Sequence, residues 1–141
     1  MKIKEIVTAY KALGDAKVNN LEESEILKII KARKAMRSIA EDFEAFLKDA
    51  QEKFKPENIE ELQAKAQKWS DLSDDEKLEL NKVLKLYETN INKALSEESE
   101  KEIDIKLEKL TEDSITKLLK NNEWSVNKLD ELSAVLWQET N

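Results

Sequence analysis

A stripe of apolar residues runs without a break from residue 26 to residue 54, and it constrains the fold more than any other feature of this chain. The apolar side chains recur three and four residues apart, which is the spacing of one face of an α-helix. No glycine or proline interrupts the stripe, and Asn20 with Glu23 can form a capping box before it. We therefore expect one helix ending near Phe54, about 50 Å long at about 1.5 Å per residue. Such a helix must bury its apolar stripe against other helices.

The same apolar spacing predicts further helices on both sides of the long one. Gly14 can end the first helix, and Pro56 ends the long helix. The expected helices cover residues 3–13, 20–54, 56–69, 73–95, 111–120 and 125–137. The helices over 20–54 and 73–95 are each too apolar on one side to stand alone, so we expect them to form a long antiparallel hairpin. The predicted fold is mainly α in a single domain, 1–141, with a helical bundle part (1–95) and a strand–helix–helix part (96–141).

Residues 101–110, KEIDIKLEKL, depart from this helical pattern. Ile103, Ile105 and Leu107 alternate with charged residues, and this period of two predicts a short strand over residues 102–108. A single strand must find another backbone to pair with. Residues 1–4, MKIK, also alternate and could pair with it inside the chain. Alternatively, the strand lies at an edge and adds to the sheet of a partner protein or a second copy. A plain helix is a third interpretation, because Ile103, Leu107 and Leu110 also fit helical spacing.

The chain is poor in residues that carry out chemistry. It has no histidine, no cysteine and a single glycine, which removes the common bases, nucleophiles and phosphate-binding loops. Asp71, Ser73 and Asp75 resemble the start of a calcium loop, but Glu76 stands where the turn glycine belongs and Lys82 where the final acid belongs. We therefore expect no catalytic residue, no cofactor and no metal site, and a protein that is not an enzyme.

Charge and aromatic residues suggest two candidate partner surfaces. The net charge of −7 disfavours general nucleic-acid binding, yet residues 1–40 carry nine basic and five acidic side chains. Arg33 and Arg37 lie in this basic stretch, on either a solvated face or a site for an acidic partner. Trp124 and Trp137 flank the last helix as core anchors or as one end of a partner groove. The candidate partner-binding residues are Ile103, Ile105, Leu107, Trp124, Trp137, Arg33 and Arg37.

The opening residues, MKIKEIVTAYKAL, bear on where the protein works. They lack the unbroken apolar core of a signal peptide, and no later stretch of the chain approaches 18 consecutive apolar residues. We therefore expect a cytoplasmic protein that does not enter a membrane.

Several segments together resemble a family of small uncharacterised proteins encoded by tailed bacteriophages and prophages. The likeness covers most of the chain, with residues 63–82 the least similar. The segments that carry it are MKIKEI, ILKIIKARKAMRSIAEDFEAFLKDAQEKF, KPENIEEL, EIDIKLEKLTEDSI and SVNKLDELSAVLW. The resemblance implies a phage setting, a location in the bacterial host cytoplasm and a place in virion or tail assembly. It implies no catalytic residue.

Two functional hypotheses follow. In the first, the chain is a non-enzymatic phage protein that acts through protein–protein interaction, with other phage proteins or with itself as an oligomer. In the second, it is a phage regulator that binds a host protein or nucleic acid through the basic face near Arg33 and Arg37.

Overall fold

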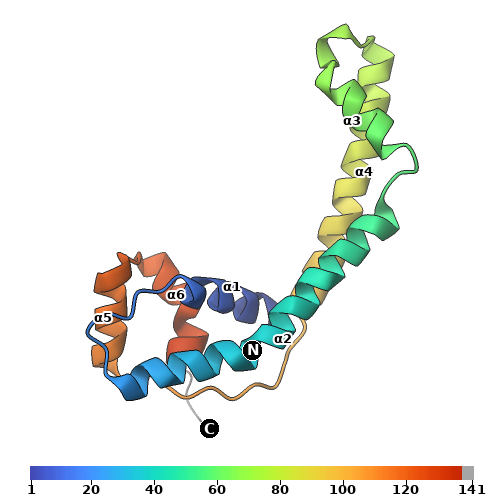
Figure 1. Cartoon of the computed structure of the whole chain (residues 1–141). Helices are drawn as coiled ribbons and strands as arrows, with labels where there is room; N and C mark the ends of the chain where they lie inside the picture. Colours follow the sequence, from blue (N-terminus) through green and yellow to red (C-terminus); the bar gives the residue numbers. More distant parts are fainter. Residues whose placement is uncertain (138–141) are drawn as a thin grey trace. The chain divides into compact units, whose positions relative to one another are not determined.

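The structure, a computed structural model, describes residues 1–137 and is mainly helical over that range (Figure 1). The helices are α1 (Ile3–Gly14), α2 (Glu23–Phe54), α3 (Ile59–Gln67), α4 (Asp74–Ser99), α5 (Glu112–Asn122) and α6 (Val126–Leu136), with a short 3₁₀ turn at Trp69–Asp71. The predicted mainly α class is therefore confirmed.

The chain forms two compact units. The first contains Met1–Glu44 together with the chain from Ser99 onward, and the second contains Ala45–Glu98. This division does not coincide with the expected parts 1–95 and 96–141. The reason is that α1 packs against α6, which places the N-terminal helix in the same unit as the C-terminal helices.

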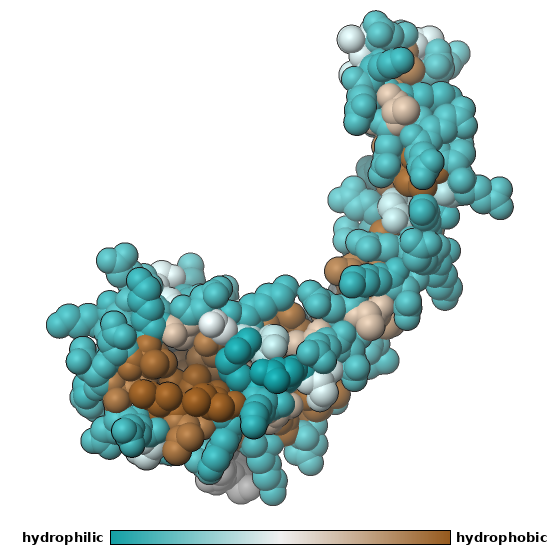
Figure 2. Space-filling view, in the orientation of Figure 1, coloured by the Kyte–Doolittle hydropathy of each residue, from teal (hydrophilic) through white to brown (hydrophobic). Residues whose placement is uncertain are grey.

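The first unit holds the larger apolar core. Its fully buried side chains include Ile6 of α1, Met36 of α2, Leu118 of α5 and Leu132 of α6. Figure 2 shows apolar residues gathered on one face of this unit, in the area that α2, α5 and α6 enclose in Figure 1. Burial of side chains from four helices in one cluster is the main source of stability for this unit.

The second unit has a smaller core. Its buried apolar residues are Ala50, Ile59, Leu62 and Leu80. The hydroxyl group of Tyr87 in α4 donates a hydrogen bond to the backbone carbonyl of Gln51 in α2 at 3.3 Å, so these two helices lie side by side there.

Local capping explains where several helices begin. The Thr111 hydroxyl accepts a hydrogen bond from the Ser114 N–H, and the Ser125 hydroxyl accepts one from the Lys128 N–H, both at 3.2 Å. These two predicted caps are confirmed, as is the box formed by Ser73 and Glu76. The predicted cap at Asn20 is wrong. Asn20 has φ 68° in a turn, and α2 begins later, at Glu23.

The predicted β element over residues 1–4 and 102–108 is wrong. Within residues 1–137 the structure contains a single isolated antiparallel bridge, between Lys2 and Glu102, and no strand. The physical reason is that α1 begins at Ile3, so the N-terminus offers too little extended backbone to form a ladder. Residues 101–110 form no helix either, so the helical interpretation is also wrong.

Candidate functional site

The segment 101–110, which we call the strap, connects α4 to α5 and is fixed at its start by the N-terminus. The Ile3 N–H donates to the Lys101 carbonyl at 3.0 Å, and the Ile103 N–H donates to the Met1 carbonyl at 2.7 Å. The Met1 amino group donates to the Ile103 carbonyl at 3.0 Å. Three hydrogen bonds therefore hold the first residues of the strap against the beginning of α1.

An exposed group of charges lies beside this contact. The Glu100 carboxylate pairs with Lys2 at 2.7 Å and also with Lys4. The hydrogen bond from Lys2, followed by the one from Lys4, lowers the pKa of Glu100 to about 2. Because all three side chains are exposed to solvent, these pairs add little stability.

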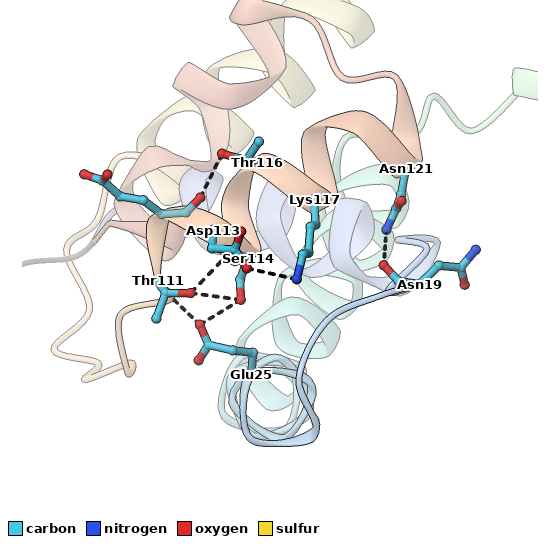
Figure 3. A network of polar contacts seen from close by, with 9 residues as sticks. Asn19, Glu25, Thr111, Asp113, Ser114, Thr116, Lys117 and Asn121 are labelled. Atoms are coloured by element: carbon cyan, nitrogen blue, oxygen red, sulfur yellow. Dashed lines mark hydrogen bonds and ion pairs between the residues drawn. The ribbon is translucent and has the colours of Figure 1, made fainter.

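The far end of the strap is fixed by Glu25 of α2, whose side chain points toward the start of α5 (Figure 3). Its Oε1 atom accepts hydrogen bonds from the Thr111 N–H at 2.7 Å and from the Ser114 hydroxyl at 2.9 Å. Its Oε2 atom pairs with the Lys28 ammonium at 2.7 Å, and Lys28 also donates to the Lys109 carbonyl at 3.1 Å. One carboxylate therefore joins α2, the end of the strap and the cap of α5.

Glu25 occupies a core position of α2, between Leu21 and Ile29, and is only 3% exposed. A buried carboxylate is tolerated when it is paired and its oxygens accept hydrogen bonds. Burial alone raises the pKa of this group, but the hydrogen bonds from Lys28, Thr111 and Ser114 outweigh burial and lower the pKa from 4.5 to about 2. The sequence prediction missed Glu25. The sequence does contain a sign of it: Glu25 is an acidic residue at a position of the helical stripe where an apolar residue is expected.

This pKa shift predicts that the first unit loses stability in acid. Because the folded-state pKa of Glu25 is depressed, its contribution is present above about pH 4.5 and is lost as the pH falls toward about 2. We expect that loss to be about 3 kcal/mol. Urea unfolding at a series of pH values between neutral and acid measures it. Glu25→Gln serves as the control and should show a shallower pH dependence; equal slopes in the two proteins would rule out this role for Glu25.

Between its two fixed ends the strap alternates in burial. Ile103 and Ile105 are partly buried and Leu107 is buried, all against the core of the first unit, whereas the residues between them are exposed. This is the pattern of an extended chain, in which successive backbone groups point to opposite edges. Within the described chain, the backbone groups of Asp104 and Lys106 form no hydrogen bond. The strap therefore presents an open backbone edge.

A groove with a volume of about 180 Å³ lies between the strap and α2. It is lined by Lys28, Lys31, Ala32 and Ala35 of α2 and by Lys106, Leu107 and Glu108 of the strap. Ala32 and Leu107 are buried and give it an apolar floor, whereas Lys31 and Lys106 are exposed. The residues of α2 and the residues of the strap that line this groove all belong to the first unit.

The structure does not bring the predicted partner-binding residues together at one surface. The side chains of Ile103, Ile105 and Leu107 face the core, and Trp124 and Trp137 are partly buried against the same core. They therefore contribute to the packing of the core.

The predicted basic face is also divided. The Arg33 guanidinium lies over the ring of Tyr10 at 4.4 Å from the centroid, and its Nε atom is buried. Arg33 thus joins α2 to α1 through a cation–π contact. Arg37 is exposed on α2.

Residues 1–137 contain no group of three or more acidic side chains placed to hold a metal ion. None of the helices in that range combines the length and the apolar character needed to span a membrane.

No family model matches the chain, and no curated protein or solved structure matches it either. The resemblance to phage proteins therefore stays a prediction.

Proposed function

We propose that this chain is a non-enzymatic interaction module that binds another protein along the strap and the adjoining groove. The observation that carries the proposal is the strap itself, which is fixed at Ile103 and at Thr111 and has an open backbone edge at Asp104 and Lys106. The absence of histidine and cysteine from the sequence supports a binding role over a catalytic one.

Extended segments bind to open edges by forming backbone hydrogen bonds, and their alternate side chains enter neighbouring pockets. Here the groove beside Lys106 and Leu107 provides such a pocket. Because the strap is held at both ends, a partner does not have to order it, and this lowers the entropic cost of binding.

The partners that we propose follow from the resemblance to phage proteins. They are other phage proteins, engaged during virion or tail assembly in the host cytoplasm, or a second copy of this chain. The alternative, a regulator that binds nucleic acid or a host protein near Arg33 and Arg37, has less support, because Arg33 is packed against Tyr10.

Size-exclusion chromatography with light scattering, on the chain alone and mixed with the products of neighbouring genes, tests the proposal. We expect a stable complex with one of these products or a defined oligomer. A strict monomer that associates with none of them would contradict it.

Substitution at Asp104 tests whether the backbone edge is used in that complex. Asp104→Pro removes one N–H donor from the open edge at an exposed position and suits an extended chain, so it leaves the core intact. We expect about tenfold weaker binding, the effect of losing one hydrogen bond. Asp104→Ala is the matched control and should bind as the unmodified chain does. Equal affinities of the two variants would show that the edge is not used.

A further inference from the structure

The cationic side chains around the groove indicate what kind of segment it binds. Three lysines and one glutamate line it. Lys28 is engaged by Glu25. Within residues 1–137, neither Lys31 nor Lys106 forms an ion pair. The groove therefore has two ammonium groups at its rim that are available to a ligand. This local positive charge contrasts with the net charge of −7 of the whole chain.

Apolar surface lies between and beside these charges. The floor of the groove includes Ala32 and Leu107, and Ala35 lies one turn after Lys31 on α2. Leu27, 53% exposed, lies one turn before Lys31 on the same helix. A ligand seated here meets an apolar surface flanked by positive charge.

We propose that the groove binds an extended segment of a partner protein in which acidic and apolar residues alternate. An apolar side chain of that segment covers Ala32, Ala35 and Leu107, and the neighbouring carboxylates pair with Lys31 and Lys106. This inference rests on the proposed function and adds the chemical class of the partner. Because both lysines are exposed, the ion pairs are screened by salt, so the affinity falls as salt is raised.

Nuclear magnetic resonance titration of the full chain with short acetylated peptides tests the proposal. The probes are a peptide of alternating glutamate and leucine, a glutamine–leucine peptide and a lysine–leucine peptide of the same length. We expect the acidic peptide to shift the amide signals of residues 28–35 and 104–108 and the other two to bind at least severalfold more weakly.

Charge reversal supplies the matched variants. Lys31→Glu with Lys106→Glu should weaken binding of the acidic peptide by about tenfold. The same double variant should gain affinity for the lysine–leucine peptide, a result that a misfolded protein could not give. Lys85→Glu, at an exposed position on α4 in the second unit, is the control and should leave the affinity unchanged.

Two results would overturn the inference in distinguishable ways. Equal binding of the acidic and glutamine peptides at the groove would remove the preference for acidic partners and leave the docking function standing. If no peptide shifts residues 28–35 or 104–108, the acidic-segment proposal fails, and the docking function is then judged by the complexes that the chain forms with neighbouring gene products.

Discussion

Glu25→Ala is expected to lower the free energy of unfolding of the first unit by about 2–4 kcal/mol. The substitution leaves the Thr111 N–H, the Ser114 hydroxyl and the Lys28 ammonium without their shared acceptor. Ser114 is buried and the bond from the Thr111 N–H is partly buried, so leaving these donors unpaired carries a desolvation cost. Urea unfolding followed by tryptophan fluorescence measures the loss, in a Trp69→Phe background so that the signal comes from Trp124 and Trp137 of this unit.

Glu41→Ala is the control for this experiment, because Glu41 is an exposed residue of the same helix. We expect a change within about 0.5 kcal/mol. Similar losses in the Glu25 and Glu41 variants would mean that the hydrogen bonds around Glu25 contribute nothing specific.

Leu118→Ala is the second substitution with a large expected effect, about 3 kcal/mol of unfolding free energy. The Leu118 side chain is 0% exposed in the core of the first unit, so its truncation removes buried apolar surface and leaves a cavity. Leu78→Ala, at a position that is 71% exposed, is the matched control and should change stability by less than about 0.5 kcal/mol.

The location of the effect of Leu118→Ala tests the division into two units. Amide hydrogen exchange should accelerate within residues 1–44 and 99–137 and remain nearly unchanged in α3 and in α4 up to Glu98. An equal acceleration in both units would show that the chain unfolds as one cooperative body.

Features determined by local sequence were predicted well. The apolar spacing placed the helices, and the caps at Thr111 and Ser125 were identified because a cap depends on residues only three positions apart. Asn20 was misjudged for the same kind of reason: its side chain fits a cap, but the backbone there adopts a left-handed turn that the local sequence does not specify.

The strap shows where local patterns are insufficient. The alternation of Ile103, Ile105 and Leu107 correctly indicated an extended chain with one buried side. It could not indicate whether another strand lay alongside, because that depends on where α1 begins, a hundred residues earlier in the sequence. Period-two patterning specifies which side chains are buried and leaves the backbone partner open.

The candidate site was the least predictable part. Glu25 and Lys31 of α2 are far in the sequence from Lys106 and Thr111, and these two parts of the chain meet only after the first unit has formed. Arg33 belonged to the predicted basic face, yet it packs on Tyr10 of α1. Residue spacing within one helix cannot predict a contact between two helices.

Amide hydrogen exchange along the strap tests the proposed docking surface most directly. We expect the N–H groups of Ile103, Leu110 and Thr111 to be protected, because each donates a hydrogen bond, and those of Asp104 and Lys106 to exchange at close to the rate of an unfolded chain. Protection of Asp104 and Lys106 equal to that of Ile103, or free exchange at Ile103 and Thr111, would contradict a strap that is held at both ends and has unpaired backbone groups at Asp104 and Lys106.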